Sequence, residues 1–256
     1  PHLCYCHTPV RYAWDQFETY FPADDPLGGP KRALVRRLRE WDRRTAGRPT
    51  RYLANSSAVA ERIRRHYGRE AGVCHPPVDV RFFEGDRGPR EDFLLAVGAL
   101  VPYKRFEWAI EAALEMGRAL VLVGKGPEKE RLSSLAAGHP EIRILSGVTA
   151  GELRELYRRC ACFVQPGEED FGIASVEAMA CGAPVVAFGR GGAADVVADG
   201  ETGVLYSGEG PGPLADAVRR AGGISFGYTR LRERAAGFCP ERFAREFRRE
   251  IEKLLS

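Results

Sequence analysis

The sequence predicts an α/β fold built on a doubly wound parallel sheet. Between residues 93 and 188, short apolar runs that suit buried strands alternate with stretches of helical periodicity. Gly and Pro punctuate the short connections between them. Hydrophobic residues make up 44% of the chain, enough for a substantial core. Alternation of this kind indicates parallel strands joined by crossover helices, and ligands of such sheets bind at the carboxyl ends of the strands.

The first region, residues 1–84, is less regular. A short strand is expected at 2–6, and Thr8 with Pro9 can cap and open a helix that runs through residues 11–20. We then expect a loop at 22–30, a basic helix at 31–46, a strand at 51–54, a helix from Ser56 to His66 and an extended segment at 74–79. Residues 85–92 are polar and rich in turn formers, which is typical of a linker.

The second region, residues 93–238, carries the regular pattern. Strands are expected at 93–98, 119–124, 142–145, 161–165 and 184–188. Helices are expected between them, at 103–116, 127–137, 150–159 and 171–181. Gly182 and Pro184 stop the last of these helices. Residues 239–256 are expected to form a final amphipathic helix with Phe243 and Phe247 on its apolar side.

Composition narrows the function classes. A net charge of +3 over 256 residues is too small to predict a nucleic-acid partner. Seven cysteines, an odd number at irregular spacing, argue against a disulfide framework and favour a reducing, cytoplasmic location. The sequence shows no apolar run long enough to cross a membrane and no signal peptide. Because it opens at Pro1 with what reads as a buried strand, we expect it to be a fragment of a longer chain.

The most informative stretch is residues 161–189, which read as strand, loop, helix, turn and strand. Glu169 falls in the loop, and Glu177 falls inside the helix. The residues between them whose backbone N–H groups can face an anion or a hydroxyl are Phe171, Gly172 and Ile173. Taken alone, the two glutamates fit an acidic helix start without a function better than they fit a binding site. Taken with the amides, they indicate a site for a polyhydroxyl ligand that carries phosphate.

The whole string is more specific than the pair of glutamates. A loop Glu, then Asp-Phe-Gly, then Glu-Ala-Met-Ala-Cys-Gly-Ala-Pro-Val-Val, resembles the donor-site signature of retaining glycosyltransferases with the GT-B fold, the large family numbered four. The run Pro-Val-Arg-Tyr-Ala-Trp-Asp after Thr8 is similar to a subgroup that builds bacterial surface polysaccharides, often with mannose. The resemblance implies that residues 1–84 end an N-terminal acceptor domain and that residues 93–238 form the Rossmann-like nucleotide-sugar domain.

A cation follows the first strand of the second region. The pattern around Lys104 is compatible with a solvated surface lysine and with a lysine that reaches a phosphate. The resemblance implies the second, because the family places a phosphate-binding Lys at this point. The family usually also has an Arg where Ala99 stands, so Arg105 is a candidate for the missing cation.

Loops after the next two strands add weaker candidates. Gly124 and Gly126 allow either an ordinary strand-to-helix turn or the close approach of a nucleotide. The segment is neither a Walker A loop nor a complete dinucleotide fingerprint. Val148 lies in a loop that resembles the family's base-contacting loop.

A group of His and Cys opens the chain. Strand alternation would place His2, Cys4 and Cys6 on one face, which leaves a zinc site conceivable, although structural zinc sites usually use Cys-x-x-Cys pairs on turns. Buried strand residues account better for the cysteines. His7 resembles the family's His in the N-terminal domain, which the resemblance implies faces the donor sugar and diphosphate.

The resemblance implies a reaction in which a hexose moves from a nucleoside diphosphate to an acceptor hydroxyl with retention of configuration. Glu177 would accept hydrogen bonds from the ribose hydroxyls, and Glu169 would hold the sugar with the neighbouring amides. Lys104 and His7 would act on the donor, with Lys104 stabilising the charge that grows on the leaving diphosphate. No metal or other cofactor is expected, because the sequence lacks an Asp-x-Asp motif and the family needs no metal.

GDP-mannose is the first expectation for the donor, with a UDP-linked sugar as the other option. The expected partners are the nucleotide sugar and a glycan or lipid-linked acceptor, and peripheral association with the inner face of the membrane stays open. Two other classes also stay open: a nucleotide-sugar epimerase or hydrolase of the same fold, and a nucleotide-binding fragment without activity.

Overall fold

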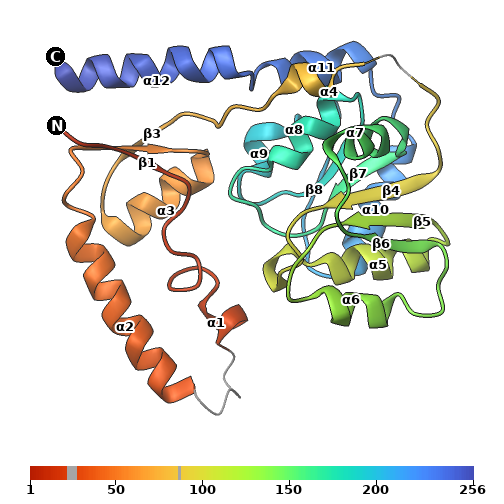
Figure 1. The fold of residues 1–256 in the computed structure, drawn as a ribbon, viewed down its shortest axis with the longest axis horizontal. Coiled ribbons are helices and arrows are strands. Elements are labelled where there is room, and N and C mark those ends of the chain that lie inside the picture. Colours follow the sequence, from red (N-terminus) through yellow and green to blue (C-terminus); the bar gives the residue numbers. More distant parts are fainter. Residues whose placement is uncertain (22–27, 86–87) are drawn as a thin grey trace. The chain divides into compact units, whose positions relative to one another are not determined.

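The structure, a computed structural model, describes residues 1–21, 28–85 and 88–256 (Figure 1). It divides into two compact units, which are described one at a time. Unit 1 comprises residues 1–75 and 243–256, and unit 2 comprises residues 76–242. The boundary therefore falls before the linker expected at 85–92, of which residues 86 and 87 lie outside the described residues.

Unit 1 is built on a small parallel sheet of three strands in the order β1-β2-β3. The strands are β1 (Leu3–Cys6), β2 (Arg51–Ala54) and β3 (Ala71–Val73), and the helices are α1 (Phe17–Tyr20), α2 (Gly28–Thr45), α3 (Ser57–Tyr67) and most of α12 (Pro240–Leu255). Helix α3 begins as predicted, because the Ser56 hydroxyl accepts from the backbone N–H of Val59 at 3.1 Å. It ends at Gly68, which adopts the left-handed conformation.

The end of the chain belongs to unit 1 because its aromatic side chains pack there. Tyr5 of β1 makes edge-to-face contacts with Phe243 and Phe247 of α12, with ring centroids 5.7 and 5.8 Å apart. Arg51 at the start of β2 also pairs with Glu250 at 2.8 Å. These contacts explain why the predicted C-terminal helix does not stand as a separate part.

Unit 2 holds a six-stranded sheet in which every pair of neighbours is parallel. Its strands are β4 (Phe93–Val97), β5 (Ala119–Val123), β6 (Ile142–Leu145), β7 (Cys162–Gln165), β8 (Val185–Phe188) and β9 (Gly203–Tyr206). The spatial order is β6-β5-β4-β7-β8-β9, so the chain changes direction across the sheet between β4 and β7. In doubly wound sheets this switch point opens the crevice where ligands bind.

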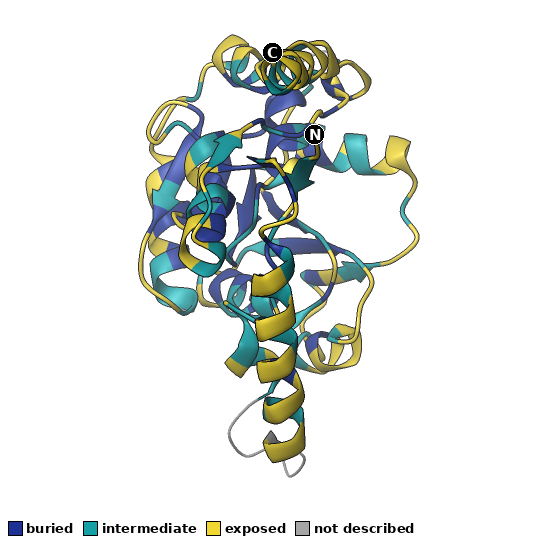
Figure 2. Ribbon diagram, turned by 90° about the vertical axis from the view of Figure 1, so that its left-hand side faces the viewer, coloured by how far each residue is buried: buried dark blue, intermediate teal, exposed yellow. Residues whose placement is uncertain are grey.

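Helices cover both faces of the six-stranded sheet. One face carries α4 (Val80–Phe83), α7 (Ala150–Arg159), α8 (Ile173–Ala180), α9 (Ala193–Val196) and α11 (Tyr228–Ala236). The other carries α5 (Phe106–Glu115), α6 (Lys129–Leu135) and α10 (Pro211–Gly222), while a short 3-10 helix, η1 (Pro102–Lys104), precedes α5. Each face of the sheet has its own hydrophobic core, and successive side chains of β4 alternate between them. Leu95 packs in the core on the α8 face, and Leu94 and Ala96 pack in the core on the α5 face. Much of this sheet is coloured as buried in Figure 2, whereas the edge strand β6 has only Ile142 buried.

The doubly wound parallel sheet predicted from the sequence is confirmed, with differences in detail. The sixth strand, β9, and the helices α9, α10 and α11 were not predicted. Lys104 ends the 3-10 turn instead of opening the helix, which begins two residues later at Phe106. The C-terminal stop of α8 is as expected, because the N–H of Gly182 donates to Met179 and that of Ala183 donates to Ala178.

Two predictions in unit 1 are wrong. The helix expected at 11–20 is reduced to Phe17–Tyr20, since residues 11–16 form turns. The loop expected at 22–30 is also too long, because α2 already begins at Gly28, while residues 22–27 lie outside the described residues. The turns at residues 11–16 are held by contacts of Asp15 with residues far away in the sequence, which a local sequence pattern does not reveal.

Candidate functional site

Two predicted site residues meet at the carboxyl edge of the six-stranded sheet. The Lys104 ammonium, which follows β4, forms an ion pair with Oε1 of Glu169, which follows β7. Their side chains are only 15% and 16% exposed. Gly167 makes this proximity possible, because a Cβ there would lie 2.3 Å from the carbonyl oxygen of Tyr103. The pair therefore spans the switch point of the sheet.

The backbone at Glu169 is fixed by the loop that follows β8. Its carbonyl accepts from the N–H of Gly192 at 2.8 Å, and a bridge of parallel type joins it to Gly191. The hydroxyl of Tyr206, at the end of β9, donates to the carbonyl of Pro166 at 3.1 Å. Residues after β4, after β8 and at the end of β9 thus hold the Glu169 segment, which itself follows β7.

The N-terminus of α8 opens beside this segment. Gly172 occupies the N-cap with φ of 100°, a conformation that favours glycine. Among the described residues, the backbone N–H groups of Ile173 and Ala174 donate to no other group. Ser175 is turned inward and donates its hydroxyl to Gln165 at 2.7 Å. The helix end therefore offers free amides to an anion or a hydroxyl.

The side chain of Phe171 points into the protein core. Its ring is 3% exposed and packs edge-to-face on Phe238, with centroids 5.5 Å apart. Ile173, in contrast, is one of the exposed large hydrophobic residues, at 47%. The segment between the two glutamates is thus anchored by one side chain and open at the next.

Glu177 lies on the face of α8 that meets α7. The hydroxyl of Tyr157, which is fully buried, donates to Glu177 Oε2 at 3.0 Å. Burial raises the pKa of the Glu177 carboxyl, and the hydrogen bond from Tyr157 opposes that rise in pKa. Tyr157 was not singled out from the sequence, where it reads as one more apolar position of a helix.

The two glycines after β5 have a role inside the protein. A Cβ at Gly124 would lie 2.1 Å from the carbonyl oxygen of Gly98, and one at Gly126 would lie 2.3 Å from that of Leu100. The N–H of Leu100 also donates to the carbonyl of Lys125 at 2.8 Å. Close packing of the loop after β4 against the loop after β5 therefore gives both glycines a role in the fold. An ordinary strand-to-helix turn, one of the two alternatives for this segment, predicts such a role.

Three other predicted positions have local partners or neighbours. The Arg105 guanidinium lies 5.3 Å from the centroid of the Trp108 ring and 3.8 Å from Glu107, on the α5 side. Its backbone has φ of 53°, the one positive value for a non-glycine residue in the described part of the chain. Ala99 is exposed, and Val148 lines a surface hollow of about 560 Å³ with Leu145 of β6 and residues of α7.

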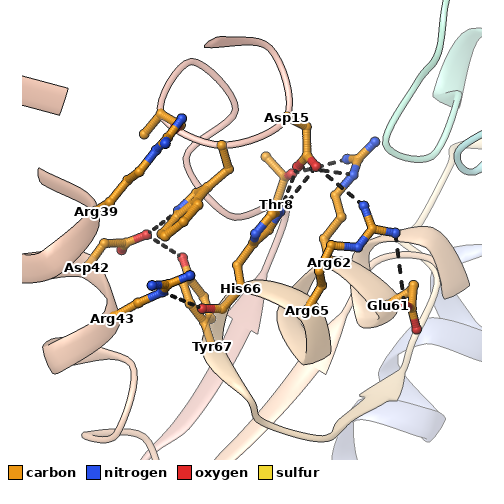
Figure 3. Close-up of polar contacts among 12 residues, drawn as sticks. Thr8, Asp15, Arg39, Asp42, Arg43, Glu61, Arg62, Arg65, His66 and Tyr67 are labelled. Atoms are coloured by element: carbon orange, nitrogen blue, oxygen red, sulfur yellow. Dashed lines mark hydrogen bonds and ion pairs between the residues drawn. The ribbon is translucent and has the colours of Figure 1, made fainter. Parts of the chain in front are cut away.

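His7 belongs to unit 1 and is not among the residues that unit 2 brings together. It is exposed and contacts Tyr5 edge-to-face, with centroids 5.2 Å apart. Residues that follow it are held by a polar network (Figure 3). In that network Arg62 donates to the Thr8 hydroxyl at 3.3 Å and lies 3.6 Å from Asp15, which also meets His66 at 3.1 Å.

Asp42 forms the second centre of the same network. Its carboxylate accepts from the Trp14 indole at 2.8 Å and from the Tyr67 hydroxyl at 2.9 Å. Trp14 stacks on His66, with centroids 4.7 Å apart. The segment from Thr8 to Asp15 is therefore tied to both α2 and α3.

Within residues 1–21, 28–85 and 88–256, no group of three His, Cys, Asp or Glu side chains is placed to hold a metal ion. The partly buried Cys4 and Cys6 pack against the small hydrophobic cluster of unit 1. In the same ranges, no helix has the length and apolar character needed to span a membrane.

A family profile described as "Glycosyl transferases group 1" matches residues 91–221, about half of the chain. The chain belongs to the glycosyl transferases group 1 family. The matched range contains Lys104, Glu169, Tyr157 and Glu177, so the ion pair and the hydrogen bond of these four residues lie within the part that defines membership of the family.

Curated relatives of this group 1 chain include two D-inositol 3-phosphate glycosyltransferases. The protein from Geodermatophilus obscurus is 38% identical over 200 residues, which cover 66% of this chain and 44% of the relative. The protein from Catenulispora acidiphila, numbered 2, is 33% identical over 205 residues, which cover 66% and 47%. The chain thus spans about half the length of these relatives, whose names do not specify mannose.

Solved structures share the fold at lower identity. Sucrose-phosphate synthase from Thermosynechococcus elongatus matches with a TM-score of 0.79 at 20% identity, over 99% of this chain and 67% of that one. Anabaena HepE in complex with UDP-glucose matches with a TM-score of 0.74 at 19% identity, over 84% and 67%. These likenesses confirm the predicted GT-B fold, and the family match confirms the predicted glycosyltransferase family.

Proposed function

We propose that this chain carries the donor-binding part of a retaining glycosyltransferase that moves a hexose from a nucleoside diphosphate to an acceptor hydroxyl. The observation that carries the proposal is the ion pair of Lys104 with Glu169 beside the free amides of α8, at the switch point of a doubly wound sheet. A cation, a carboxylate and unpaired N–H groups together match a ligand with phosphate and hydroxyl groups.

In this proposal each residue contacts a different part of the nucleotide sugar. Lys104 stabilises the charge that grows on the leaving diphosphate, and Glu169 with the amides of 171–173 holds the sugar hydroxyls. A diphosphate competes with Glu169 for the ammonium, which frees the carboxylate to accept from the sugar. Glu177 accepts from the ribose through Oε1, while Oε2 stays bonded to Tyr157. His7 is proposed as a third catalytic residue on the resemblance alone.

The donor is proposed to be GDP-mannose, on the subgroup resemblance of residues 9–15, and to bind without a metal ion. Lys104 and the N-terminus of α8 take the place of the cation on the diphosphate. The acceptor is proposed to be a glycan or a lipid-linked hydroxyl, and the names of the curated relatives add a phosphorylated inositol to that set. A cytoplasmic enzyme at the inner face of the membrane fits such acceptors.

Calorimetric titration of the chain with GDP, UDP and ADP tests the proposal. We expect at least one of the diphosphates to bind, with GDP the tightest, and the wild-type affinity to be kept by an exposed control variant, Glu130→Gln. Absence of binding by all three would overturn the nucleotide site. Tighter binding of UDP would replace GDP-mannose with a UDP-linked donor.

Transfer itself is tested with the full-length protein. Incubation with the nucleotide sugar and a lipid-linked or inositol acceptor should give a glycosylated product with the donor's anomeric configuration. Release of free sugar or conversion of the donor to its epimer, without a glycosylated acceptor, would favour the hydrolase or epimerase alternative. Binding without any turnover of the donor would favour an inactive nucleotide-binding protein.

A further inference from the structure

The α7–α8 contact pairs a buried tyrosine with a half-buried carboxylate. Tyr157 is fully buried, and its ring packs edge-to-face against Phe83 and Phe163, with centroids 5.9 and 5.8 Å away. Rings on two sides leave the tyrosine little freedom to move. Its hydroxyl therefore points in a fixed direction, at Glu177 Oε2, from 3.0 Å.

The two oxygens of Glu177 have different surroundings. Oε2 accepts from Tyr157, and within the described residues Oε1 accepts from no group. Oε1 is also absent from the buried side-chain atoms that lack a partner, so it keeps contact with solvent. A carboxylate on a helix would otherwise rotate about its last two bonds, and the tyrosine bond restricts this rotation. One oxygen is held by the protein, and the other is presented outward.

We propose that Tyr157 is a positioning residue for ligand recognition by Glu177: its hydroxyl holds Oε2 so that Oε1 is presented to the hydroxyl groups of a ribose. The proposal rests on the function proposed above, in which Glu177 meets the ribose. Tyr157 itself does not touch the ligand. Its effect on binding passes through Glu177, so the two residues act as a unit.

A structural explanation alone predicts a different outcome. A buried hydroxyl that only satisfied Glu177 in the fold would change stability when removed, with equal effects on ligands that contain or lack ribose hydroxyls. Tyr228 offers a matched control, because its hydroxyl donates to the carbonyl of Gly85 in the same unit and not to Glu177. Tyr228→Phe removes a hydroxyl of the same kind without changing the α7–α8 contact.

The experiment compares a nucleoside diphosphate with its 2′,3′-dideoxy form on the same protein sample. The ratio of the two affinities does not depend on the folded fraction, which keeps the test valid if a variant is less stable. For the wild type we expect the ribose form to bind more tightly. Tyr157→Phe should lower the affinity for the ribose form by about threefold to tenfold and leave the dideoxy form unchanged. Tyr228→Phe should leave the ratio at its wild-type value.

A double-mutant cycle completes the test. If Tyr157 acts through Glu177, Tyr157→Phe should cause no further loss of affinity in the Glu177→Gln background. A full additional loss there, or equal losses for both ligands in the wild-type background, would overturn the positioning role. If Glu177→Gln itself leaves the affinity ratio unchanged, the proposed contact of Glu177 with the ribose is wrong. That result is distinct from one in which Glu177→Gln changes the ratio and Tyr157→Phe does not, which would contradict only the positioning role of Tyr157.

Discussion

The Lys104–Glu169 contact and the Tyr157–Glu177 contact stabilise two carboxylates of one unit by opposite means. Glu169 meets a full positive charge in a loop, while Glu177 meets a neutral hydroxyl inside the helical layer. Burial raises the pKa of the Glu177 carboxyl, and the hydrogen bond from Tyr157 opposes that rise. An ion pair that a diphosphate can open suits the reacting end of a ligand, and an acceptor held in one orientation suits a part of the ligand that is only recognised.

The largest effect on activity is expected when the Lys104–Glu169 ion pair is removed. Lys104→Met in the full-length enzyme should lower kcat by about a hundredfold to a thousandfold, because the leaving diphosphate loses its cation. Steady-state transfer assays measure this, with Lys129→Met on the exposed start of α6 as control. A loss below about tenfold would show that Lys104 contributes only to structure.

The pH response should come from the other contact. As pH falls through the raised pKa of Glu177, the carboxyl takes up a proton and becomes a weaker acceptor for the ribose hydroxyls, so nucleotide affinity should fall. Titration calorimetry at a series of pH values measures this trend. Protonation of the phosphate also contributes, and Glu177→Gln isolates that part because it lacks the carboxyl. Identical pH profiles for the two proteins would contradict the assignment.

Stability should move in the opposite direction from binding at Glu177. Because the folded pKa is raised above the unfolded one, the native state binds more protons between the two values, and the free energy of unfolding falls as pH rises through that window. Glu177→Gln has no carboxyl to titrate, so it removes this fall in the free energy of unfolding. Thermal unfolding should therefore occur at a higher temperature for the variant than for the wild type above the window. A lower unfolding temperature there would show that the carboxylate stabilises the fold.

Removal of metal ions by a chelator should have the smallest effect on nucleotide affinity. The nucleoside diphosphate is proposed to bind through Lys104 and the amides of α8, so addition of EDTA should leave its affinity within about twofold. Titrations with and without the chelator, each repeated with added Mg²⁺, measure this. A several-fold loss that Mg²⁺ restores would place a metal ion in the site.

The sheet of unit 2 could be predicted from the sequence because its signal is local. Apolar runs and helix caps such as Gly182 are properties of a few neighbouring residues. The segment 11–16 could not be predicted in this way, since its turns depend on the contact of Asp15 with Arg62 and His66 in a distant helix. The short strand β9 lies among turn formers, which hide its pattern.

The candidate site shows the same limit. Lys104, Glu169 and Glu177 could be found because the family resemblance marks them. Tyr157 could not, because its role depends on how α7 packs on α8, and it lies 20 residues from its partner. The meeting of Lys104 with Glu169 across 65 residues likewise requires the order of the strands.

The division of the ligand between the two carboxylates is tested most directly by titrating the bare nucleoside diphosphate into Glu177→Gln and Glu169→Gln side by side. Glu177→Gln should weaken binding about tenfold to a hundredfold, because a hydrogen bond from the ribose to a charged group is lost. Glu169→Gln should stay within about threefold of the wild type, because the bare diphosphate lacks the sugar. Equal losses for the two variants, or a larger loss for Glu169→Gln, would contradict the account.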